Sequence, residues 1–217
     1  RHAAHCGPFN RSFHAAMNLR RATALAFALA MAAPALAQTA ATDVAGVKFP
    51  NTLQLGGSTL QLNGAGIRYK AIFKVYAAGL YLTAKAQTPE AVLAAPGPKR
   101  IHLVLLRSLD ATEFGKILSA GIEHNASRDE FVQALPAISR MGEASSQYKQ
   151  LVPGDTLTID WVPGVGCTLL VKGKPEVGPY NDVRVFNAMA KIWLGKSPAD
   201  WQLKDALMGM QKAAPVN

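Results

Sequence analysis

The chain has 217 residues, with 23 lysines and arginines and 14 acidic residues, which give a formal net charge of +9. Four arginines and no acidic residue lie in the first 37 positions, so the remainder carries +5. That excess is spread along the chain, without the clusters typical of a nucleic-acid-binding face. The two cysteines, Cys6 and Cys167, exclude a disulfide-rich scaffold.

A secretory signal begins at Met17, in the stretch "MNLRRATALAFALAMAAPALAQ". Arg20 and Arg21 form its positive start, residues 22–33 its apolar centre, and small residues ending at Ala37 its cleavage site. The apolar run is shorter than the roughly 20 residues that a membrane-spanning helix needs. The sequence therefore predicts a signal peptide cut after Ala37, a periplasmic or secreted protein, and no transmembrane segment in the mature chain.

The signal peptide fixes the expected division of the chain. Residues 1–16 precede the start methionine and are interpreted as a non-native upstream extension, so their histidines and Cys6 carry no chemistry. Residues 38–45 are interpreted as a short lead-in, residues 46–211 as one domain with its own core, and residues 212–217 as a tail.

The first half of the domain reads mainly as strand. Leu60 and Leu62 alternate with polar neighbours and predict a strand that ends at the turn signal Asn63-Gly64. More strand is expected in "GAGIRYKAIFKVYAAGLYL", residues 64–82. Thr88 predicts the N-cap of a short helix, "TPEAVLAA", and the mostly apolar "RIHLVLLR" an interior strand.

Two helices, a hairpin and further helices follow. Asp110 and Ser127, each with a glutamate three residues later, predict the starts of two helices. "GDTLTIDWVPGVGCTLLVKGK" predicts a hairpin around Pro163-Gly164. Apolar residues at helical spacing from Val185 to Trp193 predict another helix, and "SPAD", residues 197–200, caps the last one. This order indicates an α+β fold with helices layered on a largely antiparallel sheet.

Most catalytic and metal-site patterns are absent from the sequence. Gly64-Ala65-Gly66 is followed by strand residues, so it lacks the helix that a dinucleotide-binding turn requires. His102 and His124 are not spaced with other ligands as in a zinc site, and no nucleophile elbow occurs. We therefore expect no metal and no cofactor.

The sequence resembles the chalcone isomerase-like family, above all its short bacterial exported members. The resemblance covers roughly residues 46–210 and is most specific in Gly66-x-Arg68 followed by "YAAGLY", residues 76–81. It implies an open-faced β-sandwich, in which helices cover one face of a large antiparallel sheet. That fold agrees with the element order read from the sequence.

In the plant isomerases of this family, an arginine stabilises negative charge during ring closure, helped by a threonine, a tyrosine, an asparagine and a helical threonine. The resemblance places Arg68 at the arginine and Tyr76 at the first threonine. Phe114 and Gly121 fall at the tyrosine and the asparagine, and Ile192 near the helical threonine. Because each lost electrostatic stabiliser costs about 10²-fold or more in rate, flavonoid cyclisation is not expected.

An arginine paired with a tyrosine instead resembles the non-catalytic, fatty-acid-binding members. A guanidinium matches a carboxylate with a fork of donors, and a phenol adds another donor. Arg68 and Tyr76 are thus the expected carboxylate ligands, and Phe73, Phe114, Leu118 and Ile192 the expected apolar walls for an alkyl tail.

The leading hypothesis is a periplasmic, non-catalytic protein that binds a small acidic amphiphile such as a fatty acid, with no nucleic acid and no identified protein partner. One alternative is an isomerase or intramolecular lyase in which Arg68 and Tyr76 are catalytic. Another is an envelope structural module with a filled cleft.

Arg68 and Tyr76 can converge only if the chain turns between them, and the sequence between them contains no residue typical of a turn. In one straight strand, eight residues at about 3.3 Å each would place them roughly 26 Å apart. No glycine, proline or asparagine lies near residues 71–73 to mark a turn. Direct pairing would also be expected to set Lys70 against Lys74, which is unfavourable.

Overall fold

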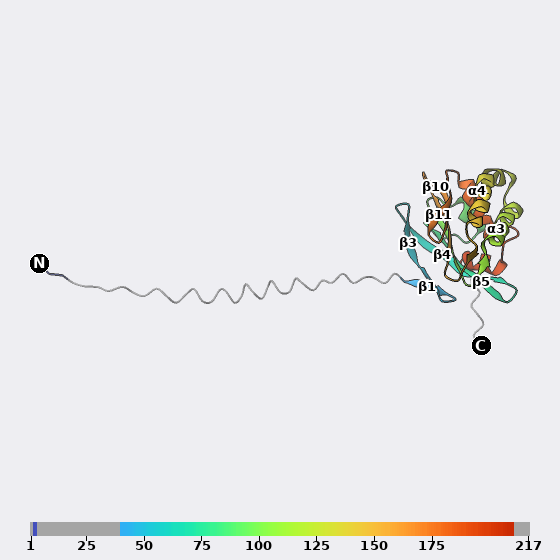
Figure 1. The fold of residues 1–217 in the computed structure, drawn as a ribbon. Helices are drawn as coiled ribbons and strands as arrows, with labels where there is room; N and C mark the ends of the chain where they lie inside the picture. Colours follow the sequence, from blue (N-terminus) through green and yellow to red (C-terminus); the bar gives the residue numbers. More distant parts are fainter. Residues whose placement is uncertain (1, 4–39, 211–217) are drawn as a thin grey trace. The chain divides into compact units, whose positions relative to one another are not determined.

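The computed structural model describes residues 2–3 and 40–210 (Figure 1). The expected signal peptide, the expected tail and most of the expected upstream extension lie outside the described residues. Of the expected lead-in, residues 41–44 form a strand, so the folded part begins before residue 46.

One large antiparallel sheet organises the described part of the chain. Its strand order is β11-β10-β9-β6-β5-β4-β3. The strands are β3 (Thr52–Leu55), β4 (Ser58–Lys70), β5 (Phe73–Leu82), β6 (Lys99–Leu105), β9 (Thr156–Val162), β10 (Gly166–Val171) and β11 (Lys174–Tyr180). As expected, β6 is an interior strand, and its alternating residues Ile101, Leu103 and Leu105 are fully buried.

Two short pairs of strands accompany the large sheet. β1 (Ala41–Val44) and β2 (Val47–Pro50) form an antiparallel hairpin. β7 (Leu109–Asp110) pairs with β8 (Gln150–Leu151) just before and just after the two central helices.

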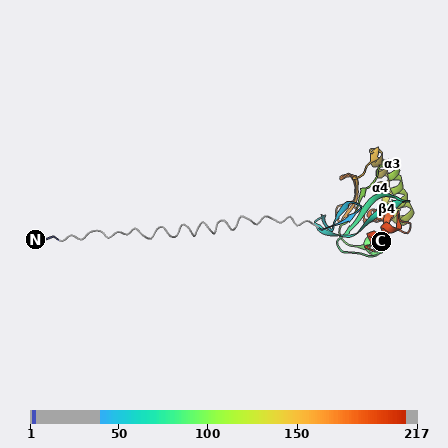
Figure 2. The ribbon, with the colours of Figure 1, turned by 90° about the horizontal axis from the view of Figure 1, so that it is seen from below.

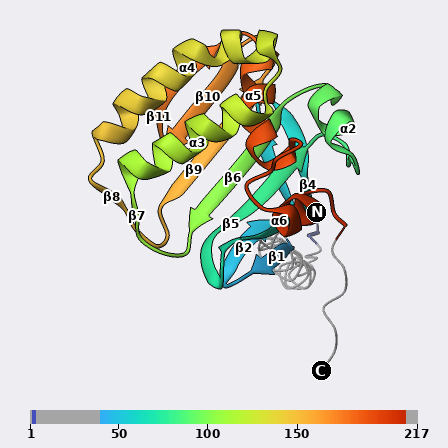
Figure 3. The same cartoon turned by 90° about the vertical axis from the view of Figure 1, so that its right-hand side faces the viewer.

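The helices are α2 (Pro89–Ala94), α3 (Ala111–Asn125), α4 (Arg128–Ser146), α5 (Val183–Leu194) and α6 (Trp201–Leu207). All of these except α5 begin where the capping signals in the sequence predict; the N-cap of α5, Asp182, was not predicted. Thr88, Asp110 and Ser127 accept hydrogen bonds from the first turns of α2, α3 and α4, and Ser127 forms a complete capping box with Glu130. Figure 3 shows α3, α4 and α5 lying over one face of the sheet.

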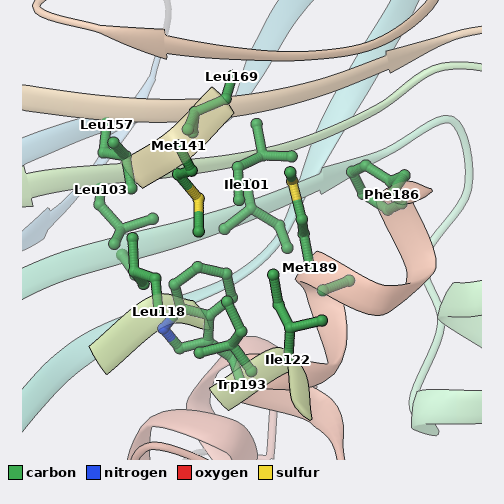
Figure 4. Close-up of a cluster of buried hydrophobic side chains, with 14 of the residues drawn as sticks. Ile101, Leu103, Leu118, Ile122, Met141, Leu157, Leu169, Phe186, Met189 and Trp193 are labelled. Atoms are coloured by element: carbon green, nitrogen blue, oxygen red, sulfur yellow. The ribbon is translucent and has the colours of Figure 1, made fainter. Parts of the chain in front are cut away.

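The two faces of the sheet have separate apolar clusters. On the helix-covered face, α3, α4 and α5 pack on alternate residues of β5, β6, β9 and β10 (Figure 4). On the other face, Phe49 of the β1–β2 hairpin packs with Leu60, Leu62, Ala77 and Tyr81 of β4 and β5. Figures 1 and 2 show helices α3 and α4 on the side opposite the blue hairpin. The fold is an α+β open-faced sandwich, as expected.

One strand prediction was wrong, and one strand was missed. β4 does not end at Asn63-Gly64 but continues through a bulge to Lys70. The Asn63 side chain bonds the backbone of Ala86 and Leu207, so it serves a long-range contact instead of a turn. β11 was not predicted, because Pro175, Gly178 and Pro179 disfavour strand; it is tolerated as an edge strand of the sheet.

Candidate functional site

Arg68 and Tyr76 are direct cross-strand partners in β4 and β5. Tyr76 belongs to the apolar cluster on the helix-covered face of the sheet, together with Ala78, Leu80 and Leu82. Every second side chain of a strand points to the same face, so the Tyr76 side chain faces the helices. The Arg68 Cζ atom lies 5.8 Å from the centre of the Tyr76 ring, within cation–π range. The two groups therefore converge on one face of the sheet.

The turn that brings them together consists of Ala71 and Ile72, between the last residue of β4 and the first of β5. Ala71 has a φ of 53°, a left-handed conformation that glycine or asparagine adopts more readily. A bulge follows the Arg68–Tyr76 pair, so Lys70 faces Phe73 and Tyr69 faces Lys74. The expected opposition of Lys70 and Lys74 was wrong because Val75 is the extra residue of that bulge.

Helix α6 holds the end of β4 beside this pair. A side chain at Gly66 would place a Cβ 2.5 Å from that of Ala206, so the close approach of the β4 backbone to α6 requires a glycine there. The N-cap of α6, Asp200, accepts hydrogen bonds from the backbone N–H groups of Leu203, at 3.1 Å, and Tyr69, at 2.8 Å. Asp200 thus ties the start of α6 to the bulge next to Arg68.

A cavity of about 240 Å³ opens between this end of the sheet and helix α3. Its lining comes from β4, β5, the loop that leads into α3, α3 itself, and α5. The lining residues are Arg68, Lys70, Val75, Tyr76, Arg107, Leu109, Asp110, Glu113, Phe114, Ile117, Leu118, Ile192 and Ala199.

Tyr76 is the buried polar group of the cavity, with 2 % of its surface exposed. Its hydroxyl oxygen accepts a hydrogen bond of 2.7 Å from the indole N–H of Trp193, which is itself fully buried. Burial raises the pKa of Tyr76 to about 12, although the Trp193 hydrogen bond and the charge of Arg68 act to lower it. The hydroxyl therefore stays protonated at neutral pH, and its proton meets no acceptor among the described residues.

Arg68 is half-buried and forms no ion pair with any carboxylate in the described part of the chain. The acids at the cavity have other contacts: Asp110 caps α3, and Glu113 pairs with Lys116. A partly desolvated guanidinium without a counter-ion, beside a phenol with a free proton, is suited to hold an anion.

The expected apolar wall is present with one exception. Phe114, Leu118 and Ile192 line the cavity, and the Phe114 ring packs edge-on against Tyr76 at 6.1 Å between ring centres. Phe73 is not among the lining residues; it is 55 % exposed, with the guanidinium of Arg107 5.0 Å from its ring centre. Phe73 is the first residue of β5, directly after the turn, and lies at the exposed end of the hairpin.

Gly121, which the resemblance aligns with an asparagine, is not a lining residue either. A side chain there would contact Ile192, its Cβ 3.1 Å from Cγ2. The space that a polar side chain would occupy is therefore filled by aliphatic atoms between α3 and α5.

Trp193 and Asp200 support the site but were not predicted from the sequence. Trp193 was seen only as a member of an apolar helix face, and its contact with Tyr76 joins residues 117 positions apart. The available signal was that a buried indole N–H requires an acceptor, and tyrosine is one of few buried acceptors. Asp200 was recognised only within a capping sequence.

Neither a metal site nor a membrane-spanning helix is found in the described residues. No group of three or more histidine, cysteine or acidic side chains in residues 40–210 is arranged to hold a metal ion. Cys167 is buried, and burial raises the pKa of its thiol to about 12. No helix among the described residues has the length and apolar character to cross a bilayer.

Comparison with known proteins agrees with this architecture. The chain is similar to the crystal structure of a fatty-acid binding protein from Arabidopsis thaliana, with a TM-score of 0.56 and 15 % identity over 75 % of this chain and 92 % of that one. No curated protein sequence matches the chain. The family described as chalcone isomerase-like matches residues 41–209, which is most of the chain and all of the large sheet with its helices. The chain therefore belongs to the chalcone isomerase-like family.

Proposed function

We propose that this protein binds a fatty acid or a similar small acidic amphiphile, without catalysis, in the cavity beside Arg68. The observation that carries the proposal is the unpaired Arg68 guanidinium next to the protonated Tyr76 hydroxyl, in a cavity that is also lined by apolar side chains of α3 and α5. Arg68 neutralises the carboxylate and Tyr76 donates a second hydrogen bond. The similarity to a plant fatty-acid binding protein supports this ligand class.

The alkyl tail lies along Phe114, Leu118 and Ile192. A separate, smaller void of about 30 Å³ lies between α3, α4 and the sheet, and Phe114 and Leu118 line both this void and the cavity. Burial of methylene groups in the cavity adds about 0.8 kcal/mol for each group. The available space favours short and medium acyl chains over long ones.

The isomerase alternative has less support from the site. An intramolecular lyase needs a group that takes or gives a proton near pH 7. Tyr76, whose pKa is about 12, donates a hydrogen bond but is a weak acid and is not ionised to act as a base. Incubation with chalcones and loss of their absorbance tests this alternative directly.

The binding test uses decanoic acid, with titration calorimetry on residues 38–217, the expected mature chain. The Arg68→Ala variant loses charge-assisted hydrogen bonds worth about 1.5–3 kcal/mol, which corresponds to about tenfold to hundredfold weaker binding. Arg128→Ala, which removes an exposed arginine at the start of α4, is the matched control and binds as the unchanged chain does.

Two comparisons isolate the headgroup. Decanol, which has the same tail without a carboxylate, binds weakly to the unchanged chain and equally to Arg68→Ala. Equal affinity of wild type and Arg68→Ala for decanoate contradicts the proposal. Fractionation of the native host tests the proposed periplasmic location, and the N-terminal residue of the purified protein tests cleavage after Ala37.

A further inference from the structure

Exposed apolar side chains gather around the mouth of the cavity. At the end of the β4–β5 hairpin, Ile72 is 84 % exposed and Phe73 55 %. Ile117, which lines the cavity on α3, is also exposed, and so is Trp201 at the start of α6. Figure 1 shows this hairpin end, in blue-green beside the label β5, projecting from the fold.

These side chains belong to one continuous surface. Phe73 contacts Arg107, and Arg107 and Ile117 both line the cavity. Ala199 lines the cavity and also an adjoining open hollow that contains Ala71 and Trp201. The hairpin end, the cavity mouth and Trp201 are therefore neighbours.

Basic residues accompany this apolar surface. Lys70, Lys74 and Arg107 are exposed and form no ion pair with a carboxylate of residues 40–210. Of the nearby acids, Glu113 pairs with Lys116, whereas Asp110 and Asp200 cap helices and form no ion pair among the described residues. The hairpin end itself, residues 68–74, contains three basic side chains and no acidic one.

The hairpin turn itself is chemically unusual. A two-residue turn most often contains asparagine or glycine, which are polar or small and accept a positive φ. Here an alanine at φ 53° is followed by isoleucine and phenylalanine. Exposed apolar side chains at a turn do not stabilise the fold, and together they mark an interaction surface.

We propose that the β4–β5 hairpin docks on an anionic lipid surface, with Ile72, Phe73 and Trp201 inserted among the lipids and Lys70, Lys74 and Arg107 at the headgroups. Aromatic and aliphatic side chains flanked by cations are the chemistry of reversible interfacial binding. Docking in this orientation brings the cavity mouth to the bilayer, so an amphiphile passes between membrane and cavity without crossing water.

The test measures co-sedimentation of residues 38–217, which contain the whole compact unit that begins at Thr39, with lipid vesicles. Vesicles of phosphatidylcholine with phosphatidylglycerol are expected to bind the chain, and phosphatidylcholine alone to bind it less. The double variant Ile72→Ser/Phe73→Ser is expected to bind about tenfold or more weakly. Lys74→Gln is expected to bind anionic vesicles about fivefold more weakly than the unchanged chain, and high salt is expected to weaken vesicle binding further.

A matched control exists on a second hairpin. Val165, 59 % exposed in the β9–β10 turn, is about as exposed as Phe73 and also lies at a hairpin turn, but it does not belong to the surface around the cavity mouth. Val165→Ser is expected to bind vesicles as the unchanged chain does. Failure of the unchanged chain to bind anionic vesicles, or equal binding by the Ile72→Ser/Phe73→Ser variant, overturns the docking proposal.

Docking and ligand binding are separated by two measurements. Without vesicles, Ile72→Ser/Phe73→Ser is expected to bind decanoate as the unchanged chain does, because neither side chain lines the cavity. Loss of that binding overturns the assignment of these residues to docking. Arg68→Ala is expected to dock on vesicles normally, so a failed decanoate experiment leaves the docking result standing.

Discussion

The indole N–H of Trp193 on α5 donates a 2.7 Å hydrogen bond to the hydroxyl oxygen of Tyr76 on β5. Both side chains are almost fully buried, so each satisfies a polar group of the other where water is excluded. With its oxygen held by the indole, Tyr76 is left with a proton to donate and a fixed direction. The helix layer thereby orients the phenol that faces Arg68.

This pair is expected to show strong energetic coupling. Tyr76→Phe leaves the Trp193 N–H buried without an acceptor, which costs about 1–3 kcal/mol of unfolding free energy. Trp193→Phe removes the donor and some packing, and costs at least as much. Urea unfolding of both single variants and the double variant is expected to give a coupling energy of about 0.5–3 kcal/mol.

The control for the pair is Trp201→Phe. Trp201 is 61 % exposed, so its substitution is expected to change the unfolding free energy by no more than about 0.5 kcal/mol. Additive effects of Tyr76→Phe and Trp193→Phe contradict the inferred role of the hydrogen bond.

Two glycine substitutions are expected to act in opposite directions. In Gly64→Ala, the new Cβ lies 2.0 Å from the backbone oxygen of Ala206, so α6 must move away from β4. The expected loss of stability is about 1–3 kcal/mol, with weaker decanoate binding because α6 also fixes the bulge beside Arg68. Gly142→Ala in α4 meets nothing within 4 Å and is expected to stabilise by about 0.5–1 kcal/mol. Thermal unfolding of both variants checks the contrast.

The features that sequence reasoning predicted correctly have local causes. Thr88, Asp110 and Ser127 each begin a helix because the cap and the N–H that it satisfies are within three residues. The interior strand β6 and the hairpin of β9 and β10 were likewise predicted from short stretches of neighbouring residues. Arg68 was identified by family resemblance instead, since one arginine in an apolar strand has no local signature.

The features that it missed depend on contacts between distant residues. Asn63-Gly64 has the composition of a turn but lies within β4. Position 64 is a glycine because α6 lies against it, and the side-chain amide of Asn63 bonds the backbone of Ala86 and Leu207. The real turn, Ala71-Ile72, has no turn composition, and the ladder of β4 and β5 together with Asp200 fixes it. Phe73 was expected on the cavity wall, but it is the first residue of β5 and lies at the exposed end of the hairpin.

Asp200 is expected to influence both stability and ligand affinity. One of its oxygens caps α6 and the other accepts from the Tyr69 N–H. Asp200→Ala loses both bonds, at a cost of about 0.5–2 kcal/mol for the cap alone. Asp200→Asn keeps one acceptor oxygen, so its unfolding free energy is expected to lie between those of the unchanged chain and Asp200→Ala. Unfolding and decanoate binding are measured on the same samples, and unchanged affinity in Asp200→Ala contradicts a positioning role.

Lys99 gives the pH dependence of stability a distinct component. It is almost fully buried, its ammonium donates a 2.6 Å hydrogen bond to the Leu93 carbonyl, and burial lowers its pKa from 10.5 to about 8. Between these values the unfolded chain holds a proton that the folded protein has released, so this group makes stability rise with pH from about 8 to 10.5. Lys99→Met is expected to remove that rise.

The comparison between the unchanged chain and Lys99→Met isolates the lysine. The buried Cys167 thiol, whose pKa burial raises from 9.0 to about 12, acts in the opposite direction above pH 9, but it is present in both proteins. The difference in unfolding free energy between the two proteins, measured by urea titration from pH 7 to pH 10, is therefore expected to shift steadily in favour of the unchanged chain. A difference that is independent of pH means that Lys99 keeps its ordinary pKa in the fold, and that its ammonium is solvated and not buried against Phe186.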